Sequence, residues 1–375
     1  MDFIIELDNE KYIFDGEMLC LFKNAKTEVE FNEANLEDVG KSITIMVSRS
    51  CNGKCKYCYE KQKDTLLNID NAKKLVKIIL EKHKRLSKLS FFGGEPLLAF
   101  RTIRYIVEEV TKYISVDSFE ITTNAVCITD EIVDFLSRYN FDVIVSVDGP
   151  EYIHDYLREG CKHEIVVRNL EKLASGKIDT RINCTYTKIQ EDKIGYDKLK
   201  EYFEKIGLKY TISRVITTDE KLNIECDPYY DIDKSIELLN EQSNQILNNI
   251  YVSNVIEAMV EHSKKELYCS KLETEYVIDD DCKIYSCNGL LEVDADAKKL
   301  KSINVKDNNF ACSECWAKNL CSVCIADVYK GDCNLPEFIG RCKDKMLYEY
   351  TLKQLVYIYH NNPIKIQTIV NNFYN

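Results

Sequence analysis

The sequence lacks any long apolar segment. Nowhere do about 18 uncharged apolar residues follow one another, which is the length that a membrane-spanning helix needs. The first residues, MDFIIELDNE, contain neither the basic start nor the apolar run of a signal peptide. We therefore expect a cytoplasmic protein that does not bind membranes.

Positive charge is also in short supply. The 375 residues include 50 Lys and Arg against 62 Asp and Glu, which gives a net charge of -12. Proteins that bind nucleic acids usually carry a basic patch for the phosphates, so this balance argues against a nucleic-acid partner.

Several common catalytic motifs are missing. The 5 histidines include no HExxH pair, which removes the support for a zinc hydrolase. The chain contains neither a GxxxxGK[ST] phosphate loop nor a GxGxxG turn after a strand, so nucleotide hydrolysis and nicotinamide chemistry lose support as well. Proline is scarce, with 5 residues, and we find no proline-rich linker and no internal repeat.

Cysteine, by contrast, is abundant. Of the 17 cysteines, three lie between residues 51 and 58 and nine lie between residues 269 and 342. In a reducing cytoplasm so many cysteines make a poor disulfide framework, and metal or redox chemistry is the favoured explanation.

Strand-like and helix-like segments alternate through the first two thirds of the chain. Apolar runs predict strands at 42–48, 89–93, 119–123, 141–147, 180–186 and 210–216, and amphipathic periodicity predicts helices at 70–84, 101–115, 130–139 and 194–206. This order is typical of an α/β fold with parallel strands, either an open doubly wound sheet or a barrel. Functional residues should gather where the strands end.

The flanking regions have different patterns. Residues 1–40 begin with a small β-hairpin, a long polar helix is predicted at roughly 229–265, and a closing helix at 343–358. The length of the chain predicts a main domain with a smaller one attached.

Cys51, Cys55 and Cys58 directly follow the first predicted strand of the alternating region, with the spacing C-x3-C-x2-C. Thiolates are the ligands that iron–sulfur clusters and soft metals prefer. A four-iron cluster held by three cysteines leaves one iron open for chemistry. The alternative is a structural zinc site completed by a remote Cys or His.

With Tyr57 before its third cysteine, the loop resembles the signature of the radical S-adenosylmethionine (radical SAM) enzymes. In that family the amino and carboxylate groups of S-adenosylmethionine (SAM) occupy the open iron of a [4Fe–4S] cluster. The resemblance implies a partial (β/α)6 TIM-like barrel, which we place at residues 41–225.

Two further segments follow in the order of the family's motifs. FFGGEP (91–96) resembles the GGE element, in which Gly93 and Gly94 allow close backbone approach and Glu95 receives the ammonium of methionine. ITTNA (121–125) resembles the Thr-Asn segment, which places Asn124 near the cofactor. Alone, a Gly-Gly-Glu is usually just a turn, and Asn124 fits an ordinary turn equally well.

The next two segments complete the predicted cofactor-binding set, which also includes Tyr57. In VSVDGP (145–150), Ser146 and Asp148 match positions that hydrogen-bond the ribose or line the substrate pocket. HDYLR (154–158) resembles an HDxxR element whose Arg158 neutralises the cofactor's carboxylate, a task suited to a guanidinium. Read singly, Asp148 fits a turn and Arg158 a solvated helix charge.

The second group of cysteines contains C-x2-C-x5-C-x2-C, a spacing that fits zinc or iron–sulfur ligation. The region resembles a SPASM domain, a radical SAM extension that holds two auxiliary [4Fe–4S] clusters, and we place it at 266–345. By that resemblance Cys269, Cys287 and Cys324 hold the first auxiliary cluster, and Cys312, Cys315, Cys321 and Cys342 hold the second.

Two cysteines depart from the SPASM pattern. Cys282 stands where the pattern has glycine, and we predict that it is the fourth ligand of the first auxiliary cluster; otherwise that cluster has an open iron for a substrate thiolate. Cys333 is surplus, and it either exchanges roles with Cys342 or is an ordinary thiol. Residues 226–265 are then a linking helical segment and 346–375 a C-terminal helix.

The resemblance implies an enzyme with three [4Fe–4S] clusters that cleaves SAM to a 5′-deoxyadenosyl radical. SPASM proteins mostly modify peptides or proteins, so the preferred substrate is a ribosomally made precursor peptide and the preferred product a thioether crosslink. Ferredoxin or flavodoxin is the expected electron donor.

The alternatives to this function are an anaerobic sulfatase maturase, a carbon–carbon crosslinking or epimerising enzyme, and a non-enzymatic zinc or iron–sulfur scaffold. Asn288 counts against the sulfatase maturase, since that group typically has Asp there.

Overall fold

The computed structural model describes residues 2–24, 27–29, 41–59, 63–215, 219–224, 227–241, 243–247, 249–265, 275–285, 306, 310–322 and 344–374. In this part of the chain no helix combines the length and the apolar character that crossing a bilayer requires.

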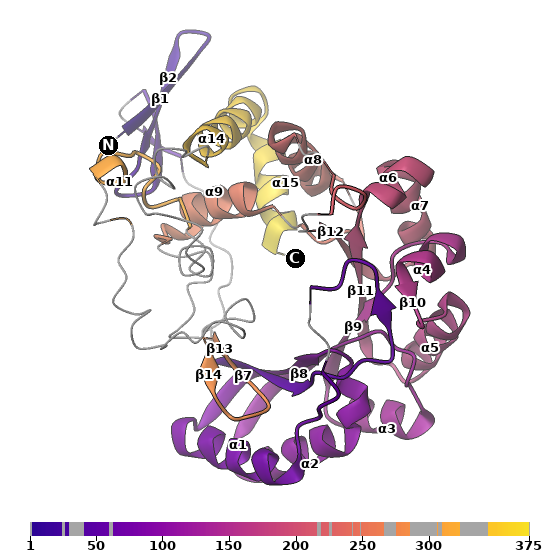
Figure 1. Ribbon diagram of the computed structural model, residues 1–375. Coiled ribbons are helices and arrows are strands. Elements are labelled where there is room, and N and C mark those ends of the chain that lie inside the picture. The colour runs from indigo at the N-terminus through magenta and orange to yellow at the C-terminus, as the bar shows by residue number, and fades with distance from the viewer. Residues whose placement is uncertain are drawn as a thin grey trace.

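A curved sheet of eight strands forms the larger body of the molecule (Figure 1). Its order is β12-β11-β9-β8-β7-β5-β13-β14, and all neighbours are parallel except β13 and β14. The strands are β5 (Ser42–Ser48), β7 (Arg85–Gly93), β8 (Ser115–Thr123), β9 (Phe141–Ser146), β11 (Asp179–Tyr186), β12 (Lys209–Arg214), β13 (Glu275–Ile278) and β14 (Ile284–Tyr285). The α/β barrel-like fold predicted from the sequence is confirmed, and the predicted strands lie within one or a few residues of the observed ones.

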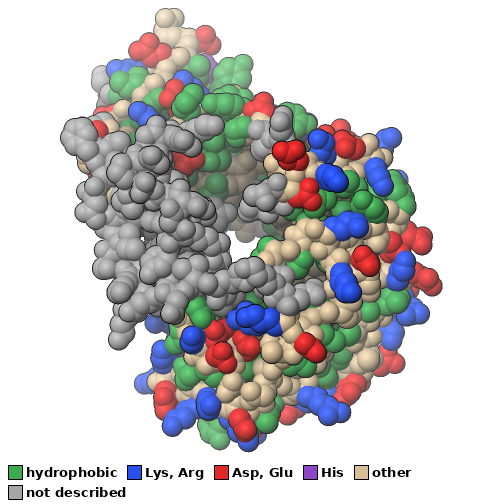
Figure 2. All heavy atoms as spheres, in the orientation of Figure 1, with side chains coloured by type: hydrophobic (Ala, Val, Ile, Leu, Met, Phe, Trp, Pro, Cys, Tyr) green, Lys and Arg blue, Asp and Glu red, His purple; other side chains and the backbone are tan. Residues whose placement is uncertain are grey.

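Helices connect the parallel strands and cover the outer side of the sheet (Figure 1). They are α1 (Ile69–Lys82), α2 (Phe100–Val110), α3 (Asp130–Arg138), α4 (Glu151–Leu157), α5 (His163–Ser175), α6 (Lys188–Lys193) and α7 (Tyr196–Ile206). The apolar faces of α1, α2, α3, α5 and α7 share one core with the sheet, in which Ile43, Phe91 and Val145 are fully or almost fully buried. Helix α4 contributes Ile153 and Leu157 to a separate, smaller cluster. Charged side chains of both signs are interspersed over the outer surface in Figure 2.

A second core joins the two ends of the chain. The strands β1 (Asp2–Leu7), β2 (Glu10–Asp15), β3 (Cys20–Lys23) and β4 (Thr27–Glu28) form an antiparallel sheet that extends beyond the predicted hairpin. Its apolar side packs against α8 (Pro228–Asn240), α9 (Ile250–Glu261), α14 (Asp344–Asn361) and α15 (Pro363–Tyr374). Trp316 lies in this core and stacks on Phe3 at 4.5 Å between ring centroids.

The single helix predicted at 229–265 is wrong, because α8 and α9 are separate. α8 ends at Asn240, and a new N-terminal cap starts α9, where the Asn249 side chain accepts hydrogen bonds from the backbone N–H groups of Tyr251 and Val252. Asparagine is favoured at such caps because its side-chain oxygen satisfies helix N–H groups that lack partners. The closing helix predicted at 343–358 corresponds to α14, but the segment predicted as one C-terminal helix, 346–375, contains two helices, α14 and α15.

Candidate active site

The loop that carries Cys51, Cys55 and Cys58 begins after β5 and is held by a short antiparallel pair. Strand β6 (Lys54–Cys55) pairs with β10 (Arg158–Glu159), so that Cys55 is directly opposite Arg158. The backbone N–H of Lys56 also donates to the carbonyl of Leu157 at 2.9 Å. This pairing explains how a motif some hundred residues away brings its arginine to the cysteine loop.

The two glycines of FFGGEP let the end of β7 lie against that loop. Gly93 has φ 148°, and a Cβ there would come within 2.0 Å of the Ser48 carbonyl oxygen. A Cβ on Gly94 would lie 2.5 Å from the carbonyl oxygen of Ser50. Glycine is required here because no larger residue permits the close approach.

Glu95 is fully buried and is occupied by protein donors. Its carboxylate accepts hydrogen bonds from the Thr123 hydroxyl at 2.7 Å, from the backbone N–H of Asn124 at 2.8 Å and from that of Leu97 at 3.0 Å. Burial raises the pKa of Glu95, and these hydrogen bonds oppose that rise. Glu95 does not line the cavity described below. The sequence predicted that Glu95 receives the cofactor's ammonium, whereas in the structure its carboxylate holds the end of β8 in place.

Asn124 connects the end of β8 to the cysteine loop. Its side-chain amide donates to the Asn52 side chain at 2.7 Å and lies 3.9 Å from Cys51 Sγ. Its own oxygen accepts the backbone N–H of Val126 at 3.0 Å. The sequence prediction places Asn124 near the cofactor, and the structure places it beside the first cysteine.

Asp148 and Arg158 form a buried ion pair beneath the loop. Arg158 donates from Nε and Nη2 to the two carboxylate oxygens at 2.8 and 3.3 Å, and the Tyr57 hydroxyl donates to the same carboxylate at 2.5 Å. Burial lowers the pKa of Arg158, but Asp148, Tyr57 and Cys55 together more than reverse this, so that the pKa lies above its usual range. Arg158 Nη1 also lies 3.8 Å from Cys55 Sγ, which places a permanent positive charge at the cysteine loop.

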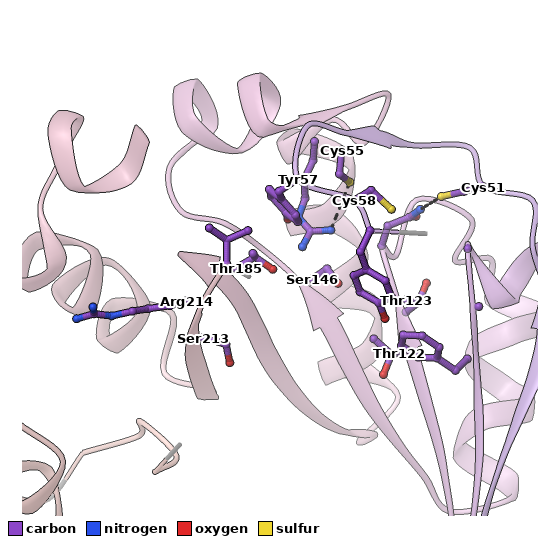
Figure 3. Close-up of a pocket in the computed structure, with 17 residues that line it drawn as sticks. Cys51, Cys55, Tyr57, Cys58, Thr122, Thr123, Ser146, Thr185, Ser213 and Arg214 are labelled. Carbon is purple, nitrogen blue, oxygen red and sulfur yellow. Dashed lines mark hydrogen bonds between the residues drawn. The ribbon is translucent and has the colours of Figure 1, made fainter. Parts of the chain in front are cut away.

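These residues enclose a cavity of about 300 Å³ (Figure 3). Of the predicted set, Tyr57, Gly93, Gly94, Asn124, Ser146, Arg158 and the three cysteines line it. Asp148, which is fully buried, supports Arg158 and Tyr57 from behind and does not line the cavity.

Sequence reasoning missed the far side of this cavity. Thr122, Thr185, Ser213 and Arg214 line it from the ends of β8, β11 and β12. Their common signal is a polar residue at the carboxyl end of a parallel strand, which could have identified them.

The three cysteines fit a [4Fe–4S] cluster by their chemistry and exposure. Cys51 and Cys55 are partly exposed and Cys58 is exposed, and all three line one cavity. Burial raises the pKa of the Cys55 thiol to about 11, and Arg158 opposes that rise. Because the ligands of a cluster are thiolates, loading this site releases protons from the loop.

The described part of the C-terminal cysteine region gives a compact turn. Cys312, Cys315 and Cys321 are partly exposed, and the Lys306 ammonium donates to the carbonyls of Lys318 and Cys321. The predicted ligands Cys269, Cys287, Cys324 and Cys342, with the surplus Cys333, lie outside the described residues.

Cys282 lies in the turn between β13 and β14. Its φ of 64° is the left-handed conformation that favours glycine, as expected for the position where the SPASM pattern has that residue. Its thiol is 3.3 Å from the backbone carbonyl of Asn71, to which it donates a hydrogen bond. The thiol therefore faces α1 in this structure, and its role as a cluster ligand stays a prediction.

His154 provides a pH-dependent contribution to stability. It is fully buried, its Nδ1 accepts the backbone N–H of Asp148 at 3.3 Å, and burial lowers its pKa from 6.5 to about 4. Between these pH values the unfolded chain binds the proton and the folded chain does not. The free energy of unfolding should therefore fall as the pH falls from 6.5 to 4, by up to about 1.4 kcal/mol per pH unit.

This expectation is tested by unfolding the wild type and His154→Gln across that pH range. The difference between them should shrink as the pH falls, since the variant lacks the titrating imidazole. A difference that stays constant with pH would show that His154 does not titrate in this way.

Comparison with known proteins agrees with this geometry. Residues 45–194 match the Radical SAM superfamily model. The radical SAM cyclopropyl synthase TigE of Paramaledivibacter caminithermalis is 35% identical over 141 residues, which cover 32% of this chain and 29% of the relative. A cysteine-type anaerobic sulfatase-maturating enzyme of Clostridium perfringens (strain 13 / Type A) is 26% identical over 44% of this chain and 48% of the relative. The chain thus aligns with less than half of either relative's length.

Solved structures extend the likeness in fold. The structure of anSMEcpe with bound AdoMet and Cp18Cys peptide matches 86% of this chain and 99% of its own, with a TM-score of 0.63 and 21% identity. Streptococcus suis SuiB bound to S-adenosylmethionine matches 80% of this chain and 76% of its own, with a TM-score of 0.59 and 16% identity. Residues 45–194 of this chain therefore form a radical SAM domain, which indicates an enzyme, and the chain is similar to a radical SAM cyclopropyl synthase and to a sulfatase-maturating enzyme.

Proposed function

We propose that this enzyme is a peptide maturase that forms a thioether crosslink from a cysteine sulfur to a carbon of a ribosomally made precursor peptide. The observation that carries the proposal is the cavity that joins the three cysteines to the polar ends of β8, β9, β11 and β12. In the proposal the cofactor occupies the cysteine side of that cavity, and the peptide approaches from the side of β12.

Cys51, Cys55 and Cys58 would hold a [4Fe–4S] cluster with SAM at its open iron, and this cofactor would supply the radical chemistry that removes hydrogen from an unactivated carbon. The chain's own residues position and shield this chemistry. Arg158 presents a buried cation next to Cys55, where it can pair with the carboxylate of methionine. Ser146 and Asn124 offer polar groups to the cofactor, and Glu95 and Asp148 keep their neighbours in place.

Atoms and electrons balance in the formation of the thioether product. One hydrogen atom leaves the carbon to the radical, and one proton and one electron leave as the sulfur–carbon bond closes. In the proposal a SPASM domain at 266–345 would hold an auxiliary cluster able to accept this electron, and ferredoxin or flavodoxin would supply the electron that starts the reaction. A peptide substrate is supported by two related folds, since anSMEcpe was solved with the Cp18Cys peptide and SuiB with its precursor peptide SuiA.

An anaerobic sulfatase maturase is the second candidate. It is favoured by the match to 99% of the anSMEcpe chain, and disfavoured by Asn288, which stands where that group typically has Asp. The likeness to the cyclopropyl synthase keeps carbon–carbon bond formation as a further alternative.

The experiment that separates these candidates uses anaerobic, cluster-loaded enzyme with dithionite, SAM and short peptides encoded by neighbouring reading frames. The proposal expects 5′-deoxyadenosine and a peptide that has lost a pair of hydrogens, retains its sulfur and no longer reacts with thiol reagents. Conversion of cysteine to an aldehyde with loss of sulfur would establish the sulfatase-type reaction instead. Formation of no nucleoside would contradict any radical SAM activity.

Arg214 is expected to bind the peptide. It lines both the cavity at the cysteines and a neighbouring cavity of about 610 Å³, and its Nη2 pairs with Asp231. Its buried Nη1 has no hydrogen-bond partner among the described residues. An unpaired buried donor is costly, so a substrate carbonyl or carboxylate is the natural acceptor.

Arg214→Gln should therefore raise the KM for the peptide roughly 10- to 150-fold, as expected for the loss of about 1.5–3 kcal/mol from a hydrogen bond to a charged group. SAM cleavage without peptide should stay near the wild-type rate. Arg181→Gln is the matched control, because Arg181 pairs with Glu120 away from the cavity. Equal effects of both variants on KM would rule out a specific contact.

Cys315 tests the role of the C-terminal cysteines. Because the proposal assigns it to an auxiliary cluster, Cys315→Ala should retain part of the abortive SAM cleavage while product formation is lost. Measurement of 5′-deoxyadenosine and modified peptide in the same reaction checks this. Equal loss of both products would argue against the proposed division of roles.

A further inference from the structure

Three side chains of metal-ligand type meet outside the active-site cavity. A ligand atom from each of Cys20, Glu28 and His262 lies within 4.8 Å of the other two. Cys20 Sγ and His262 Nδ1 are 3.5 Å apart. Cys20 and His262 are 242 residues apart in sequence, so the fold itself creates this cluster.

The N-terminal sheet supplies two of the three side chains. Strand β3 pairs with β4, with Phe22 opposite Glu28. Because successive residues of a strand point to opposite faces, Cys20 shares the face of Phe22, while Leu21 points into the second core. The thiol and the carboxylate therefore emerge on the same side of the sheet.

Helix α9 supplies the imidazole. His262 is its C-terminal cap, with φ 51°, and its backbone N–H donates to the carbonyl of Ala258. Helix α9 lies beside the N-terminal sheet (Figure 1), and both contribute to the same core. The nearby Lys264 ammonium forms an ion pair with Glu17 at 3.1 Å, so the positive charge of Lys264 is neutralised by that carboxylate.

We propose that Cys20, Glu28 and His262 bind a zinc ion that fastens the N-terminal sheet to the end of α9. Thiolate, imidazole and carboxylate are all ligands that zinc takes in proteins, and a water molecule completes a tetrahedral site. The three residues are at least partly exposed, which gives the ion a path from solvent. The site is separate from the three-cysteine loop and its role is structural.

The test uses anaerobic enzyme with all clusters loaded, equilibrated with a fixed low concentration of free Zn²⁺ and analysed for zinc and iron per chain. Wild type should hold one zinc more than Cys20→Ala and His262→Ala, at unchanged iron content. Glu28→Gln should bind zinc more weakly. Unchanged iron and unchanged SAM cleavage show that the variants remain folded.

His360→Ala is the matched control. His360 also joins the N-terminal sheet to a helix, through Tyr12 at 3.0 Å and Glu10 at 3.2 Å, and these partners are a phenol and a carboxylate in place of the thiol beside His262. Added Zn²⁺ should raise the melting temperature of the wild type and of His360→Ala but not that of His262→Ala. Equal zinc content and equal zinc response in all variants would overturn the proposal and leave Cys20, Glu28 and His262 as a hydrogen-bonded cluster.

Discussion

Replacement of Cys55 by alanine is expected to abolish reductive cleavage of SAM. Cys55 is anchored opposite Arg158 by the β6–β10 pair, so no neighbouring residue can take its place without breaking that pairing. With two cysteines left on the loop, the chain cannot hold a cluster that has a single open iron. The measurement is 5′-deoxyadenosine formed under dithionite reduction.

The matched control is Cys184→Ala. Cys184 is a fully buried thiol of the main core and does not line the cavity, so its removal should leave the nucleoside yield close to that of the wild type. If Cys55→Ala formed 5′-deoxyadenosine at the wild-type rate, the three-cysteine loop would not be the binding site of the cluster that cleaves SAM.

Replacement of Arg158 by methionine should cost about 3–5 kcal/mol of stability, the range for breaking a buried ion pair. Both partners are almost completely buried, with side-chain exposures of 7% and 0%. Without Arg158 the Asp148 carboxylate keeps the Tyr57 hydroxyl and the backbone N–H of Thr185 as donors but loses its counter-ion. Denaturant unfolding under anaerobic conditions measures the loss.

Two further variants make this prediction specific. Arg158→Met combined with Asp148→Asn should recover much of the stability, because no uncompensated charge remains, yet it should not recover SAM cleavage. Arg85→Met breaks the exposed pair with Asp117, where both side chains are more than one third exposed, and should cost less than about 1 kcal/mol. Similar losses for Arg158→Met and Arg85→Met would contradict the importance assigned to the buried pair.

The main sheet could be predicted because its strands are short apolar runs separated by amphipathic helices. The strand ends were less clear: β7 begins at Arg85, four residues before the predicted start at 89, since its first part carries exposed charge beside Asp117. The break between α8 and α9 was missed because the helical periodicity continues on both sides of the cap at Asn249.

Most of the motif residues lie around one cavity, but their individual positions depend on packing that motifs do not encode. Glu95 and Asp148 were expected at the cofactor, and both are buried behind residues that reach the cavity. The contact of Cys20 with His262 joins segments with no shared motif, so no spacing in the sequence could have indicated it.

The central claim is that Cys51, Cys55 and Cys58 hold a cluster whose open iron binds SAM. Electron paramagnetic resonance of the anaerobically reduced enzyme tests it most directly, in a Cys315→Ala background that simplifies the signal. Addition of SAM should change the spectrum of the wild-type loop and leave that of Cys55→Ala unaffected. A reduced cluster at the intact loop whose spectrum is the same with and without SAM would contradict the account.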